Sequence, residues 1–135
     1  MTPAKGSAVP KTPAAAIRRI RGICEALPEV VDKPFAGHTA AQWRVRDKFF
    51  AMTSEDGKML SLKGDRGAQQ ALIAANPDRY YVPKYVGSKG WVGVWLTHPE
   101  GIDWDELEEL ILEAYCLIAP KTLVKEWERS LSEQG

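Results

Sequence analysis

The spacing of apolar residues changes its period along this chain, and this change constrains the fold more than any other sequence feature. Between Ile17 and Leu27, apolar side chains recur every three or four positions, as on one face of a helix. From residue 39 they recur every second position, and Trp43 and Val45 alternate with polar neighbours as in a strand with one buried face. A chain that contains both periods in succession is typical of an α+β domain.

Turn and capping signals divide the first half of the chain into one helix and three strands. Thr12-Pro13 combines a hydroxyl cap with proline at the first helical position, and the helix is expected to end before Pro28. The period of two then predicts strands over 42–46, 49–53 and 60–63. Asp47-Lys48 is the expected first turn, and Asp56-Gly57 favours a tight second turn. These segments predict an antiparallel meander.

The second half repeats the pattern of a helix followed by strands. A short helix is expected between Asp65 and Asn76. Residues 79–86 are predicted to form an edge strand or an interrupted one, because Pro83 cannot donate a backbone hydrogen bond. Residues 91–96 form the clearest strand, in which Gly93 indicates a bulge or a close backbone contact. The apolar residues expected on the short helix are Ala68, Ala71, Leu72 and Ala75.

The last predicted elements are helical. Asp103 and Glu106 match a capping box at the start of a helix, and Leu123, Trp127 and Leu131 indicate a further short helix. The predicted fold is therefore α+β and two-layered, in the order α-β(3)-α-β(2)-α, with a twisted antiparallel sheet covered by helices. The side chains predicted for its core include Leu60, Leu62, Val94, Leu107 and Ile111.

A chain of 135 residues has the usual size of one domain. Residues 1–11 are predicted to be a flexible tail, residues 12–131 the domain, and residues 132–135 a second tail. No apolar run approaches the roughly 20 residues that span a bilayer, and the start lacks the apolar stretch of a signal peptide. We therefore expect a cytoplasmic protein without a membrane partner, and a monomer.

The net charge is zero, but the charges are unevenly distributed. Residues 1–99 contain fifteen Lys and Arg against eight Asp and Glu, whereas residues 100–135 contain three against ten. Such a distribution predicts one basic and one acidic face.

Several phrases of the sequence resemble the MmcQ/YjbR-like family of small bacterial proteins. The resemblance runs over roughly residues 14–127. Its matching stretches are residues 43–51, 60–63 and 85–93, the pair Asp103-Trp104, Tyr115, and Ala119-Pro120-Lys121. It implies a two-layer α+β fold, and a DNA-binding role has been proposed for the family because of that fold. It supplies no catalytic residues.

Basic side chains near aromatic ones suit phosphate neutralisation and base stacking. The residues predicted to bind nucleic acid in this way are Arg44, Arg46, Lys48, Lys84, Lys89 and Trp91. The two arginines are expected to project from the same face of one strand. The alternative is that these are solvated outward positions, with Trp91 and Trp95 in the core. A protein-interaction module that uses exposed aromatic side chains is a further alternative.

No residue pattern in the sequence specifies a reaction, a cofactor or a metal. His38 and His98 lack an apparent catalytic partner, and the acids around Asp103 are explained by helix capping and a solvated face. The turn 87–90 lacks the spacing of a phosphate-binding P-loop. Cys24 and Cys116 are expected to be small buried residues. A small-molecule-binding or enzymatic domain therefore requires a pocket that the sequence does not reveal.

Overall fold

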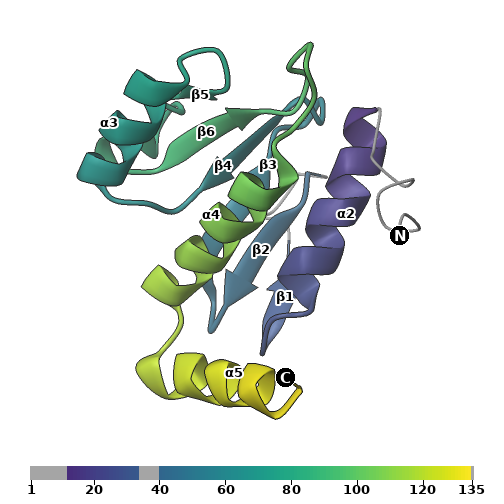
Figure 1. Cartoon of the computed structure of the whole chain (residues 1–135), viewed down its shortest axis with the longest axis vertical. Helices are drawn as coiled ribbons and strands as arrows, with labels where there is room; N and C mark the ends of the chain where they lie inside the picture. The colour runs from purple at the N-terminus through teal and green to yellow at the C-terminus, as the bar shows by residue number, and fades with distance from the viewer. Residues whose placement is uncertain (1–11, 34–39, 135) are drawn as a thin grey trace.

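The computed structural model describes residues 12–33 and 40–134 of the chain and shows a sheet covered by helices (Figure 1). The elements, in chain order, are α2 (Pro13–Glu25), β1 (Val30–Asp32), β2 (Gln42–Val45), β3 (Lys48–Thr53), β4 (Met59–Leu62), α3 (Arg66–Ala75), β5 (Tyr80–Tyr81), the short 3₁₀ helix η1 (Gly87–Lys89), β6 (Val92–Trp95), α4 (Trp104–Ile118) and α5 (Lys121–Gln134).

The described strands form one antiparallel sheet in the order β1-β2-β3-β4-β6-β5. Helices α2 and α4 lie across one face of this sheet, as Figure 1 shows. The predicted α+β class and the layer of helices on the sheet are thereby confirmed. The strand 79–86 was predicted to be an edge or interrupted strand, and β5 is indeed short and lies at the edge.

Side-chain caps explain where three of the helices begin. The N–H of Ala15 donates to Thr12 Oγ1 over 3.1 Å, and the N–H of Ala68 donates to an Asp65 carboxylate oxygen over 2.8 Å. Asp103 caps α4 in the same way. Each cap provides an acceptor for an N–H group that has no partner within its helix.

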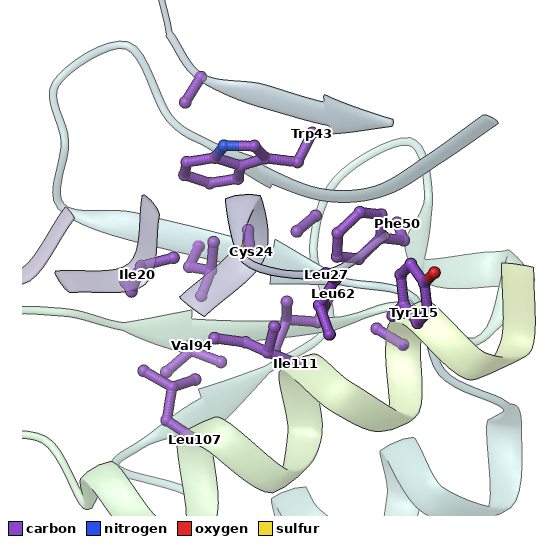
Figure 2. Close-up of a cluster of buried hydrophobic side chains, with 14 of the residues drawn as sticks. Ile20, Cys24, Leu27, Trp43, Phe50, Leu62, Val94, Leu107, Ile111 and Tyr115 are labelled. Carbon is purple, nitrogen blue, oxygen red and sulfur yellow. The ribbon is translucent and has the colours of Figure 1, made fainter. Parts of the chain in front are cut away.

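The core lies between the sheet and the two helices α2 and α4. Trp43, Phe50 and Tyr115 are fully buried, and the ring of Phe50 meets that of Tyr115 edge to face at a centroid distance of 5.8 Å (Figure 2). Figure 2 also shows Leu107 and Ile111 pointing from α4 toward the sheet. The five core residues predicted from the sequence are all buried, which confirms that set.

Two details of the strands differ from the sequence-based expectations. Strand β1, over Val30–Asp32, was not predicted, because three residues are too few to establish a period of two. The first turn lies at Arg46-Asp47 and not at Asp47-Lys48, because Arg46 and Asp47 adopt φ of +52° and +66°. Lys48 is consequently the first residue of β3.

The helices also contain three departures from the predictions. In α3 the buried side chain is Gln69, whereas Ala68, Ala71 and Ala75 are exposed. Helix α5 continues to Gln134, so residues 132–134 are helical and not a tail. Cys24 is buried as expected, but Cys116 is exposed, because it lies on the outer side of α4. The predicted tail 1–11 lies outside the described residues.

Within the described ranges, no helix is long and apolar enough to cross a membrane.

Candidate nucleic-acid interface

The strand register collects basic residues from distant segments at one end of the sheet. Val45 at the end of β2 pairs with Lys48 at the start of β3. The N–H of Lys63, just after β4, donates to the Phe50 carbonyl, and Leu62 pairs with Val92 at the start of β6. We call this region the basic end. Its cations are Arg46, Lys48, Lys63, Arg66, Lys84 and Lys89.

Three of the lysines predicted to bind nucleic acid are available to solvent. Lys48, Lys84 and Lys89 are exposed, and none forms a salt bridge with another described residue. They come from the start of β3 and from the turn that joins β5 to β6. Their ammonium groups are therefore free to contact an anion.

Arg46 differs from these lysines because it is already paired. Its guanidinium donates two hydrogen bonds to the carboxylate of Glu29, over 2.5 and 2.9 Å. The hydrogen bonds from Arg46 lower the pKa of Glu29 below its ordinary value. Because the Glu29 carboxylate offsets the charge of the Arg46 guanidinium, Arg46 attracts a phosphate less strongly than an unpaired cation would.

Arg44 lies on the face of the sheet opposite α2 and α4. Its guanidinium carbon lies 4.1 Å from the ring centroid of Phe49, and its Nε donates to the Lys33 carbonyl over 3.2 Å. The prediction that Arg44 and Arg46 project from one face of a strand is wrong for Arg46. Strand β2 ends at Val45, and the left-handed conformation of Arg46 redirects its side chain toward Glu29.

Side chains of α3 hold the turn that carries Lys84 and Lys89. Gln69 is buried, and its amide group donates to the carbonyls of Gly87 and Trp91 over 2.9 and 2.6 Å. Arg66 donates two hydrogen bonds to the Ser88 carbonyl. Because these contacts fix the backbone from residue 87 to 91, Lys89 projects from a defined turn.

The aromatic side chains near this turn are not equally accessible. Trp91 is only 6% exposed, so its ring has little surface for stacking. Trp95 is half-buried, and its ring lies beside that of Tyr81 at a centroid distance of 4.6 Å. The prediction placed Trp91 in the interface, but the more accessible of these two tryptophans is Trp95.

Sequence reasoning missed three contributors to the basic end: Lys63, Arg66 and Tyr85. Lys63 Nζ lies 3.4 Å from the Lys89 carbonyl, and Arg66 reaches the same turn from α3. Tyr85 is 95% exposed. No local signal marks Lys63 or Arg66, whereas Pro83 indicates that the strand breaks before Tyr85.

The other candidate sites show ordinary structural contacts. The Nδ1 of His98 accepts a hydrogen bond from the N–H of Glu100, and His38 lies outside the described residues. Glu106 accepts a hydrogen bond from the hydroxyl of Tyr80, so the capping box is only half formed. Burial raises the pKa of the Cys24 thiol, which disfavours the thiolate. No group of three potential metal ligands occurs in the described part of the chain.

A shallow hollow of about 670 Å³ lies between α2, α4 and α5. Its apolar lining includes Ile23, Leu112, Trp127 and Leu131. This is the helix-side surface to which the alternative of a protein-interaction module would apply, and that alternative remains a prediction.

Comparisons with known proteins agree with the architecture. The model of the YjbR family matches residues 25–117. The crystal structure of Deinococcus radiodurans protein DR2400, described as a DUF419 domain, aligns with a TM-score of 0.70 and 24% sequence identity. That alignment covers 82% of this chain and 86% of DR2400, and it bears on the fold alone. A search of curated proteins found no match.

Proposed function

We propose that this chain, which belongs to the YjbR family, binds nucleic acid weakly and with little sequence preference through the basic end of its sheet. One observation carries the proposal. Three exposed lysines, Lys48 from the start of β3 and Lys84 and Lys89 from the turn between β5 and β6, lie at one end of the sheet without a salt bridge to any described residue. Exposed cations of this kind bind phosphates by displacing condensed counterions.

The acids of the sheet's opposite end support this orientation. We call it the acidic end, and it lies where β6 ends. Its acids are Asp78, Glu100, Asp103, Asp105 and Glu106. Tyr80, which pairs with Val94 of β6, donates its hydroxyl hydrogen to Glu106, so the start of α4 adjoins that end. These acids thus lie away from Lys48, Lys84 and Lys89, and a phosphate bound by those lysines would not adjoin them.

The predicted affinity is modest because few cations are free. Arg46 is paired with Glu29, and the formal net charge of the chain is zero. Binding that rests on phosphate contacts has a Kd on the order of 10⁻⁴–10⁻⁶ M at physiological salt. Little base discrimination is expected, because lysine contacts to phosphates carry no sequence information.

The test is a salt titration of binding to a short labelled oligonucleotide. Replacing Lys84 and Lys89 together by Ala should weaken binding and reduce the slope of log K against log salt by about 1.4–1.8, the share of two phosphate contacts. The melting temperature should change little, because both side chains are exposed.

The matched control removes two cations far from the basic end. Arg18 and Lys58 are exposed, and Gly57 beside Lys58 lies against Ile17 of α2 at the opposite end of β4. Replacing both by Ala should leave the salt slope nearly unchanged. Equal loss in the two double variants would contradict the location, and absence of binding by the unaltered protein at low salt would remove the proposal.

A further inference from the structure

Tyr85 combines almost complete exposure with an unusual backbone conformation. Its side chain is 95% exposed, and its φ is +67°. The N–H of Val86 donates to the Lys84 carbonyl over 2.7 Å, which closes a three-residue turn with Tyr85 at its centre. A non-glycine residue at positive φ in such a γ-turn is strained. The chain therefore holds an aromatic ring in solvent in a conformation that the residue itself disfavours.

The surroundings of the turn explain how this conformation persists. Gly87 lies so close to Val82 that a Cβ there would be 2.3 Å from the Val82 Cγ1 atom. The N–H of Gly87 donates to the Pro83 carbonyl, and the side-chain amide of Gln69 donates to the Gly87 carbonyl. Strain that neighbouring contacts impose in this way is common at ligand-binding positions. The position of Tyr85 is thus determined by packing on both sides of the turn.

The chemistry around the ring is complementary to a nucleotide. Lys84 and Lys89 are exposed on the same turn, and the segment 82–92 contains no carboxylate. Asp65, the nearby acid that precedes α3, is engaged in capping that helix. An exposed aromatic ring between lysines offers a stacking surface for a base and two cations for its phosphates.

We propose that Tyr85 stacks on an unpaired base, so that the basic end prefers single-stranded nucleic acid to duplex. This inference rests on the proposed function and adds the class of ligand. In a duplex the faces of the bases are stacked on one another, so a ring on a fixed turn finds no free face except at the ends. In a single strand every base has an accessible face, and stacking tolerates any sequence.

The experiment compares one labelled 15-nucleotide strand with the blunt-ended duplex that it forms with its complement, by fluorescence anisotropy at low salt. Every base of that duplex is paired, so the Tyr85 ring can stack only on its two ends. We expect the unaltered protein to bind the single strand roughly tenfold more tightly. Tyr85→Ala should weaken single-strand binding by roughly tenfold, and should leave duplex binding unchanged.

Two further variants separate stacking from folding and from charge. Tyr85→Phe is the matched control, because it keeps the ring and should retain the preference for the single strand. Tyr85→Gly relieves the positive φ, so it should fold at least as well as the unaltered protein and still lose the preference. Equal binding of the two ligands, or an unaffected Tyr85→Ala variant, would overturn the inference and leave the proposed function standing. No binding to either ligand would overturn both.

Discussion

Gly93 shows how a single missing Cβ shapes the helix-free face of the sheet. It lies in β6 opposite Tyr81, and the Tyr81 ring rests directly over it beside Trp95. The sequence indicated a bulge or a close backbone contact at this position, and the structure shows a close contact with an aromatic ring. Partial burial of that ring raises the pKa of the Tyr81 phenol to about 12, so it is neutral at physiological pH.

Gly93→Ala should therefore be destabilising by about 1–3 kcal/mol, the range for overpacking. A Cβ at this position would lie 2.3 Å from Tyr81 Cζ, so the ring would have to leave Gly93 and its contact with Trp95. Urea denaturation of the variant measures the change. Gly22→Ala is the control, because nothing lies within 4 Å of its Cβ position in α2 and alanine favours the helix by about 0.5–1 kcal/mol. Unchanged stability of Gly93→Ala would mean that the ring moves freely.

Residue identity alone revealed part of the candidate interface. Exposed lysines such as Lys84 and Lys89 are visible in the sequence as cations near turn signals. The pairing of Arg46 with Glu29 was not predictable. It depends on the left-handed conformation of Arg46 and on a partner seventeen positions earlier in the chain. Tyr85 was also missed as a ligand contact, because a tyrosine in a strand-like segment is usually expected to be partly buried.

At the scale of elements, the sequence predicted best those that have their own start signals. Helices α2 and α4 begin at the caps that the sequence indicated, Thr12 and Asp103. Helix α3 shows the limit of periodicity, because its alanines suggested an apolar face while tertiary contacts bury Gln69 instead. Only the fold places two backbone carbonyls, of Gly87 and Trp91, opposite that amide.

Gln69→Ala tests whether this amide links α3 to the turn. The variant leaves the carbonyls of Gly87 and Trp91 without their side-chain donor, and buried polar groups without a partner cost about 1–3 kcal/mol. We expect a destabilisation of that size in urea denaturation. Gln70→Ala changes an exposed neighbour of the same type and should stay within about 0.5 kcal/mol of the unaltered protein. Equal effects of the two substitutions would contradict the idea that the Gln69 amide links α3 to the turn.

At the scale of the whole molecule, the antiparallel register brings cations from distant segments to one end of the sheet. The segments that contribute Lys48, Lys63 and Lys89 are dispersed along the chain, yet they share one end because successive strands reverse direction. The sequence predicted a basic and an acidic surface from the charge counts. It could not show which cations share one end of the sheet, since that requires the strand order β4-β6-β5, in which β6 lies between β4 and β5.

The separation of the basic end from the acidic end makes a prediction about ionic strength, which rests on the proposed function. Asp78 and Glu100 are exposed at the acidic end, in the turns that precede β5 and follow β6. The four residues of β6, which separate the turn of Lys89 from that of Glu100, span about 13 Å, so these charges lie beyond the Debye length of about 8 Å at 0.15 M salt and within that of about 30 Å at 0.01 M. The double substitution Asp78→Asn with Glu100→Gln removes both charges and keeps the size of each side chain. It should leave single-strand affinity unchanged at 0.15 M and raise it severalfold at 0.01 M. Anisotropy titrations at the two salt concentrations measure both values. An equal gain at both would place the acids beside the bound strand, and would contradict the assignment of binding to the basic end.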